Sequence, residues 1–230
     1  MTRNEYWDLF EMVRQDIECA IACNCTYLTI NNLAVSDEEL YQTFYRNRGY
    51  WHLTQYALQA TFFISLGRVF DEKKSTASIQ RLVESTIDHP GFFSKAAVRL
   101  EKIRLHNGHE PEWLDEYMAR AWEPTRADLE SIDNALRPHH EKFKQIYQPI
   151  RHVYFAHRGR LGADVIGRLF ARTVIKDVSE ILKFLYTVVD SIWEMWANGT
   201  RLDLVGTQAY DRFAEQQSRQ AEALVRRIAP

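Results

Sequence analysis

The chain has 230 residues, of which 46% are hydrophobic and 13% are aromatic, and this composition is too apolar for a disordered protein. Its 29 basic and 31 acidic residues give a net charge of −2, which excludes a general polycationic coat for nucleic acids and confines any nucleic-acid site to a local surface. The 9 glycines and 6 prolines are too few for the tight turns of a sandwich or barrel, so the composition favours helices.

The N-terminal segment contains acidic residues and has no basic stretch followed by an apolar core, so we expect no signal peptide. No uncharged apolar stretch reaches the roughly 20 residues that span a bilayer, which predicts a cytoplasmic protein with no membrane partner. Cys19, Cys23 and Cys25 lie close together without a distant cysteine, and their C-x3-C spacing is not typical of a zinc site. We therefore expect free thiols and no metal or other cofactor, and the role of the three cysteines stays open.

Apolar residues at helical spacing predict a first helix over about residues 3–30. Ser36 and Glu39 have the spacing of a capping box, which opens the next helix. The apolar stripe of that helix continues to Phe70, and Gly49 is the expected place of a bend. The polar residues that follow Phe70 end it.

Shorter helices are predicted over residues 78–87, 92–106 and 111–122. Pro124 is typical of the first turn of another helix, which runs towards Pro138, resumes, and is disturbed again by Pro149.

A regular apolar seam, with residues alternately three and four apart, predicts a long helix over residues 175–196 that Asn198 and Gly199 end. A polar C-terminal helix is predicted over about residues 207–228. The chain shows no alternating strand pattern and no repeat. We therefore predict one all-α domain over residues 1–230, a helical bundle with long antiparallel core helices and peripheral helices.

Several enzyme classes are excluded by missing motifs. The chain has no Glu-x-x-His or His-Glu-x-x-His metal motif, no Walker A or G-x-G-x-x-G loop, and no G-x-S-x-G element. What remains is a mainly apolar segment in which Arg151 is followed six residues later by His157, with His152 directly after the arginine.

This segment resembles the signature of the HEPN superfamily, all-α proteins that often act as ribonucleases. That signature is an Arg, commonly a polar residue after it, and a His after four to six intervening residues. His152 supplies the polar residue. The runs 66–71 and 75–79 are similar to the branch linked to bacterial abortive infection of phage, the Abi U type. The resemblance covers roughly residues 40–200 and places an HEPN-like core at about 36–200.

The resemblance implies a metal-independent endoribonuclease that acts on RNA as a homodimer, in phage defence or as a toxin, with a neutralising antitoxin-type protein as a candidate partner. Arg151 and His157 are the implied catalytic pair. Their chemistry fits, because His exchanges protons near neutral pH and Arg stabilises the growing charge of a phosphorane. The residues expected to bind substrate are His152, Tyr154, Arg158 and Arg160. The alternative is a non-catalytic helical module that dimerises or binds protein or nucleic acid.

On an ideal α-helix, a separation of six residues places Arg151 and His157 about 120° apart, so they would flank a groove that a second subunit completes. From residue 151 to residue 176 the chain has six basic residues and one acid, Asp164, which predicts a basic surface beside the motif. The spacing alone is not specific, because it also fits Arg46 and His52, Arg99 and His106, and Arg104 and His109. We favour Arg151 and His157 because of their surroundings and their place in the fold.

Overall fold

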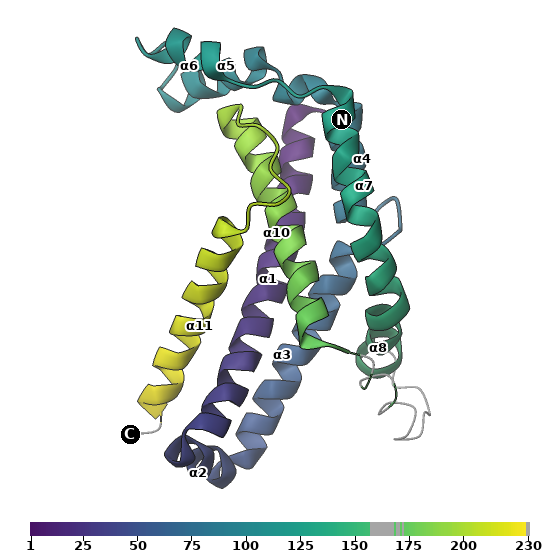
Figure 1. Ribbon diagram of the computed structural model, residues 1–230, viewed down its shortest axis with the longest axis vertical. Coiled ribbons are helices and arrows are strands. Elements are labelled where there is room, and N and C mark those ends of the chain that lie inside the picture. The colour runs from purple at the N-terminus through teal and green to yellow at the C-terminus, as the bar shows by residue number, and fades with distance from the viewer. Residues whose placement is uncertain (157–167, 169–170, 172, 229–230) are drawn as a thin grey trace.

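Four long helices form the body of the protein in the computed structural model, which describes residues 1–156, 168, 171 and 173–228 (Figure 1). They are α1 (Arg3–Ser36), α3 (Arg48–Val69), α10 (Ile175–Asn198) and α11 (Gln208–Ile228). Helices α1 and α11 run in the opposite direction to α3 and α10, and no strand occurs among the described residues. The predicted all-α bundle with long antiparallel core helices is confirmed.

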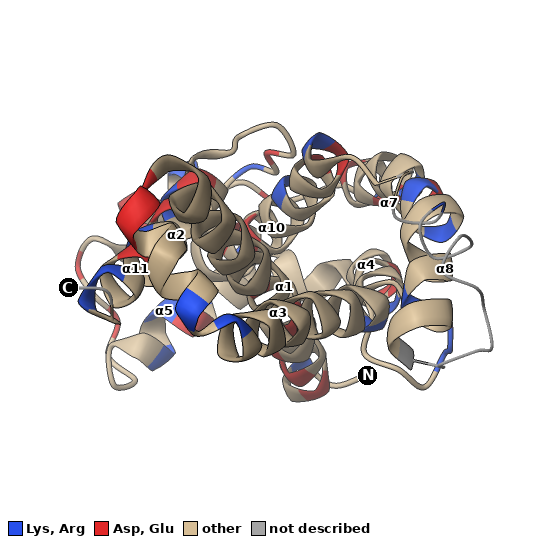
Figure 2. Cartoon of the chain, turned by 90° about the horizontal axis from the view of Figure 1, so that it is seen from below, with Lys and Arg blue, Asp and Glu red and all other residues tan. Residues whose placement is uncertain are grey.

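Helix α1 lies at the centre of the bundle and contacts α3, α10 and α11, as the view along the bundle shows (Figure 2). Its inward side chains are almost completely buried; they include Tyr6, Phe10, Val13, Ile17 and Ile21. Burying a large apolar side chain stabilises a fold by about 1.5–3 kcal/mol, so α1 contributes a large share of the core. The N-terminal helix is therefore packed inside the bundle.

The first two helices follow from their capping residues. Thr2 and Glu5 form a capping box in which the Thr2 hydroxyl accepts the Glu5 N–H and the Glu5 carboxylate accepts the Thr2 N–H. Helix α1 extends through Ser36, and Asp37 caps α2 (Glu38–Arg46) by accepting the N–H of Leu40 at 3.2 Å. The predicted cap at Ser36 was therefore wrong by one residue.

The predicted single helix up to Phe70 is broken, and the break falls at Asn47 instead of Gly49. Asn47 has non-helical angles (φ −109°, ψ 31°), and its side-chain amide donates to the carbonyl of Thr43 at 3.1 Å. Asn competes with the helical backbone through such local hydrogen bonds, which explains why α2 ends there and α3 begins at Arg48.

The short helices of the middle region are confirmed. They are α4 (Ile79–Asp88), η1 (Pro90–Phe93), α5 (Lys95–Leu105) and α6 (Leu114–Arg120). Helix α7 (Arg126–Lys142) begins at the cap Thr125, so Pro124 precedes the helix instead of lying in its first turn. Helix α7 also continues through Pro138, where we expected a break. Its buried face, with Leu129, Ile132 and Leu136, offsets the hydrogen bond that proline removes.

Two π-helical turns follow α7, and the second contains Arg151 of the candidate motif. They are η2 (Phe143–Tyr147) and η3 (Arg151–Ala156), separated by α8 (Gln148–Ile150), which contains Pro149. The N–H of Gln148 donates to the carbonyl of Phe143, five residues earlier, as a π turn requires. Proline cannot donate to an α-helical ladder and its ring clashes with the carbonyl four residues earlier, so a wider turn at Pro149 has a local cause.

Helix α10 ends as predicted. Gly199 adopts the left-handed conformation (φ 58°), and its N–H donates to the carbonyl of Met195. The predicted C-terminal helix is α11. Within the described part of the chain, no helix is both long and apolar enough to cross a membrane.

Candidate functional site

The side chain of Arg151 lies against Gly67 in α3. A Cβ atom at Gly67 would come within 2.8 Å of Arg151 Cζ and closer still to Cδ and Nε. A glycine is therefore required at this point of the buried face of α3 for the guanidinium to occupy its place. Gly67 belongs to the 66–71 run that the sequence resemblance singled out, and this contact gives that run a structural role.

The guanidinium of Arg151 has unused hydrogen-bonding capacity. Its Nε atom is buried without a hydrogen-bond partner among the described residues, and Nη1 lies 3.3 Å from Nε2 of His152. An arginine donor can bond to this nitrogen only when it carries no proton. No carboxylate in the described part of the chain forms an ion pair with Arg151, and a guanidinium is suited to binding a phosphate.

Aromatic side chains hold η3 against α3. The ring of Phe155 stacks on Phe63 with centroids 4.8 Å apart, and Tyr154 meets Tyr56 edge-on at 6.3 Å. Phe63 and Gly67 are four residues apart and therefore share one face of α3. This face of α3 thus sets the position of the motif.

Of the predicted site residues, Arg151, His152 and Tyr154 lie in η3. His152 is exposed and Tyr154 is half-buried. The others lie outside the described residues: His157, Arg158 and Arg160. The angle of about 120° assumed an ideal α-helix, and it does not apply to a segment that begins with a π-helical turn. Of the predicted basic run, Arg168 and Lys176 are exposed, whereas Arg172 and Asp164 lie outside the described residues.

In two of the three alternative Arg–His pairs, the arginine forms ion pairs with acidic side chains. Arg104 bonds to Glu101 through two nitrogens (2.6 and 3.1 Å), and Arg99 forms ion pairs with Glu110 and Asp115. The third pair, Arg46 and His52, is exposed near the break between α2 and α3. His52 lies in the first turns of α3.

Comparison with known protein families identifies the chain. A family model, AbiU2 of the HEPN type, matches residues 4–224. The chain belongs to this family. The match extends beyond the roughly 40–200 covered by the sequence resemblance and takes in α1 and most of α11. No curated protein and no solved structure shows a significant match.

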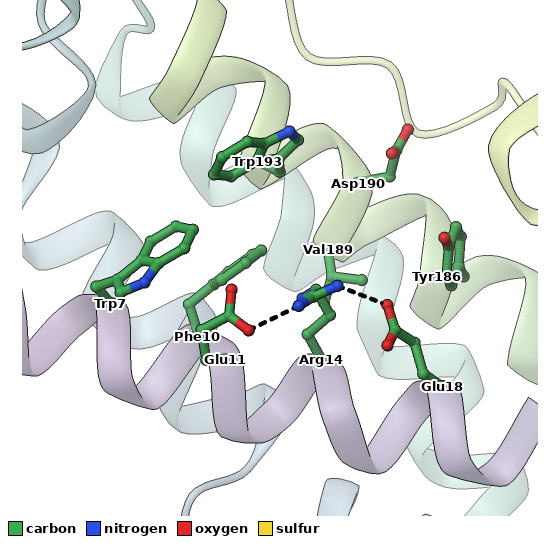
Figure 3. A pocket seen from close by; sticks show the side chains of 9 residues that line it. All are labelled: Trp7, Phe10, Glu11, Arg14, Glu18, Tyr186, Val189, Asp190 and Trp193. Carbon is green, nitrogen blue, oxygen red and sulfur yellow. Dashed lines mark hydrogen bonds and ion pairs between the residues drawn. The ribbon is translucent and has the colours of Figure 1, made fainter. Parts of the chain in front are cut away.

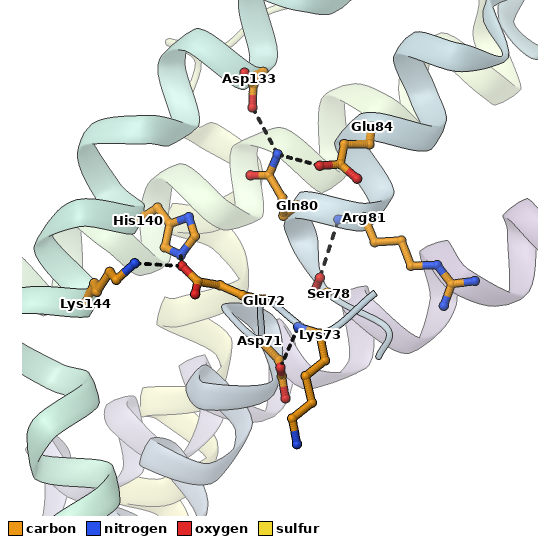
Figure 4. A network of polar contacts seen from close by, with 10 residues as sticks. All are labelled: Asp71, Glu72, Lys73, Ser78, Gln80, Arg81, Glu84, Asp133, His140 and Lys144. Atoms are coloured by element: carbon orange, nitrogen blue, oxygen red, sulfur yellow. Dashed lines mark hydrogen bonds and ion pairs between the residues drawn. The ribbon is translucent and has the colours of Figure 1, made fainter. Parts of the chain in front are cut away.

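In this AbiU2-family protein, a polar network joins the loop after α3 to the segment that leads to η3 (Figure 4). The Glu72 carboxylate lies 3.0 Å from Nζ of Lys144 in η2 and 3.4 Å from Nε2 of His140 in α7. Lys144 lowers the pKa of Glu72 through this hydrogen bond. Asp71 accepts the N–H of Lys73 at 2.9 Å and thus shapes a local turn. These contacts tie the loop that follows α3 to α7 and η2.

The pocket in Figure 3 lies between α1 and α10 and has a volume of about 310 Å³. Arg14 donates there to Glu11 at 2.7 Å and to Glu18 at 2.8 Å. Asp190 also lines this pocket, and burial, with a contribution from Glu194, raises the pKa of its carboxyl group. Three carboxyl groups around one guanidinium make this pocket a poor site for a phosphate.

The three cysteines are free thiols. Burial raises the pKa of Cys23, with Cys19 contributing, and burial also raises the pKa of Cys25. The described residues contain no group of three His, Cys, Asp or Glu side chains placed to hold a metal ion.

Sequence reasoning did not find the role of Gly67. The signal was present, because a glycine inside the apolar stripe of a helix costs about 1 kcal/mol relative to alanine and therefore points to a close approach. The sequence could not predict that Arg151 is the side chain that approaches Gly67, because the two residues are far apart in the chain.

Proposed function

We propose that this protein is a metal-independent endoribonuclease of HEPN type, located in the cytoplasm and acting in phage defence or as a toxin. The observation that supports it best is the Arg151 guanidinium, held on Gly67 without a carboxylate partner among the described residues, six residues before His157. Membership of the AbiU2 family is consistent with this role.

The reaction uses the substrate's own nucleophile. The ribose 2′-oxygen attacks the neighbouring phosphorus, the bond from phosphorus to the 5′-oxygen breaks, and the products are a 2′,3′-cyclic phosphate and a free 5′-hydroxyl. His157 takes the proton of the 2′-hydroxyl or gives one to the leaving 5′-oxygen, since imidazole exchanges protons near neutral pH. Arg151 stabilises the negative charge that grows on the phosphorane oxygens.

A homodimer would complete the site. Apolar side chains are exposed along α3, among them Tyr50, Leu53 and Ile64, and this stripe continues to Tyr56, which packs on Tyr154 of η3. Exposed apolar surface of this kind is typical of an interface. A two-fold axis through the stripe would bring two copies of η3 together and combine two arginines and two histidines around one phosphate.

The test is cleavage of single-stranded RNA by purified variants. We expect Arg151→Ala and His157→Ala each to abolish cleavage. Little change in circular dichroism or melting temperature is expected for Arg151→Ala, because Arg151 is not among the buried core residues. His52→Ala is the matched control, since it belongs to the rival pair, and it should stay active. Activity that is lost in His52→Ala and kept in His157→Ala would contradict the assignment.

The alternative is a helical module that binds protein or nucleic acid without catalysis. This alternative predicts that the wild-type protein binds RNA and leaves it intact in all conditions. Arg151→Ala would then weaken RNA binding and have no other effect.

A further inference from the structure

A cavity of about 230 Å³ lies beside the motif, between α1, α3, η2 and the start of α10. Phe63 is common to both features, because it lines the cavity and also stacks on Phe155 of η3. Gln59, one turn before Phe63 on the same face of α3, lines the cavity as well. Gln59, Phe63 and Gly67 therefore connect the cavity, η3 and Arg151 along one helix face.

The walls of this cavity combine aromatic rings with two carboxamides. The rings include Tyr27, Phe63 and Tyr147, and the amides are those of Asn24 in α1 and Gln59 in α3. Neither amide has a hydrogen-bond partner among the described residues. Each offers a carbonyl acceptor and an NH₂ donor.

The described residues lining the cavity include no Asp, Glu, Lys or Arg, and such a lining favours an uncharged group. Its volume is below the roughly 300–1,000 Å³ of sites for drug-sized ligands, which favours one flat ring system over a whole nucleotide. Aromatic walls stack on flat rings, and carboxamides bond to an edge that carries both donors and acceptors. A nucleobase has all of these properties.

We propose that this cavity binds one nucleobase of the RNA and gives the enzyme a base preference next to the cleaved phosphate. The inference rests on the proposed function for its substrate. Gln59 and Gly67 are eight residues apart, about 12 Å along α3, so the base and the phosphate that Arg151 contacts bind along the same helix. The Asn24 and Gln59 amides select the base by hydrogen bonds to its edge, while Phe63 lies beside the ring.

The first experiment maps cleavage sites in a randomised single-stranded RNA pool. We expect the wild type to prefer one base near the cut by about tenfold or more, because a wrong base leaves an amide of the site without its hydrogen bond. Asn24→Leu and Gln59→Leu should reduce this preference to about twofold while cleavage itself continues. Gln55→Leu is the matched control, since it lies one turn earlier on α3 and its amide donates to Asn31 outside the cavity; it should keep the wild-type preference.

The second experiment needs no cleavage. Binding of the four free nucleosides to the Arg151→Ala variant is measured by NMR, with and without Gln59→Leu. Selective binding that Gln59→Leu removes supports the inference even if the wild type proves inactive on RNA, in which case only the proposed function fails. Cleavage without base preference, or a preference that survives both leucine variants, overturns the inference and leaves the nuclease activity intact.

Discussion

Replacing Gly67 with alanine tests whether RNA cleavage depends on the position of the Arg151 guanidinium. The added Cβ would lie 2.8 Å from Cζ, so this atom must retreat by at least about 0.6 Å to reach the 3.4 Å of an ordinary contact, and Cδ and Nε must retreat further. A displacement of about 1 Å in a catalytic group costs on the order of 100-fold in rate. We expect cleavage by Gly67→Ala to fall by that order.

The same substitution should leave the fold intact. The clash involves the end of a flexible side chain, which can move, and alanine is favoured over glycine inside a helix by about 1 kcal/mol. We therefore expect the free energy of unfolding to stay within about 1 kcal/mol of the wild type, equivalent to a shift of about 2–4 °C in melting temperature.

The assay compares initial cleavage rates of a fluorescent RNA with melting followed by circular dichroism. Gly49→Ala is the matched control, because it also lies in α3 and an added Cβ would meet nothing within 4 Å. It should keep full activity. The reasoning is refuted if Gly67→Ala cleaves within about twofold of the wild type while Arg151→Ala is inactive. It is also refuted if Gly67→Ala fails to fold.

Three further outcomes are expected. Cleavage should survive EDTA, leave a 2′,3′-cyclic phosphate and spare DNA, which lacks the 2′-hydroxyl; loss in EDTA with recovery in Mg²⁺ would contradict the mechanism. Light scattering should show a dimer that Leu53→Glu dissociates, whereas Leu100→Glu, equally exposed (65%) but on α5, should leave it unchanged; a monomeric wild type would contradict the shared site. Burial against Phe184 lowers the pKa of His139 in the folded protein. As the pH falls through about 6.5, His139 therefore takes up a proton in the unfolded chain before it does so in the folded protein, and the free energy of unfolding decreases below that pH. His139→Phe should lose less stability than the wild type between about pH 7.5 and 5.5, and equal losses in melting temperature would contradict this.

The amino-acid sequence by itself determined most of the helices and the family. Helix positions follow from local chemistry, such as the capping box at Thr2 and the left-handed Gly199, so a sequence pattern predicts them. The Arg151 motif was likewise visible from spacing and neighbouring residues. Asn and Gly both favour a helix end, and the chain has both at Asn47 and Gly49. The sequence therefore predicted the break at Gly49, two residues after its position at Asn47 in the structure.

Only the tertiary structure decided what surrounds the motif. The close approach of Arg151 to Gly67, the stacking of Phe155 on Phe63, and the cavity that joins Asn24 to Gln59 all bring together residues far apart in the chain. Such contacts depend on which helix faces meet and at what depth, and periodicity within one helix carries no information about either. The π turns beside Pro149 have both origins, since proline is the local cause of a wider turn and η3 is packed on α3 in the tertiary structure.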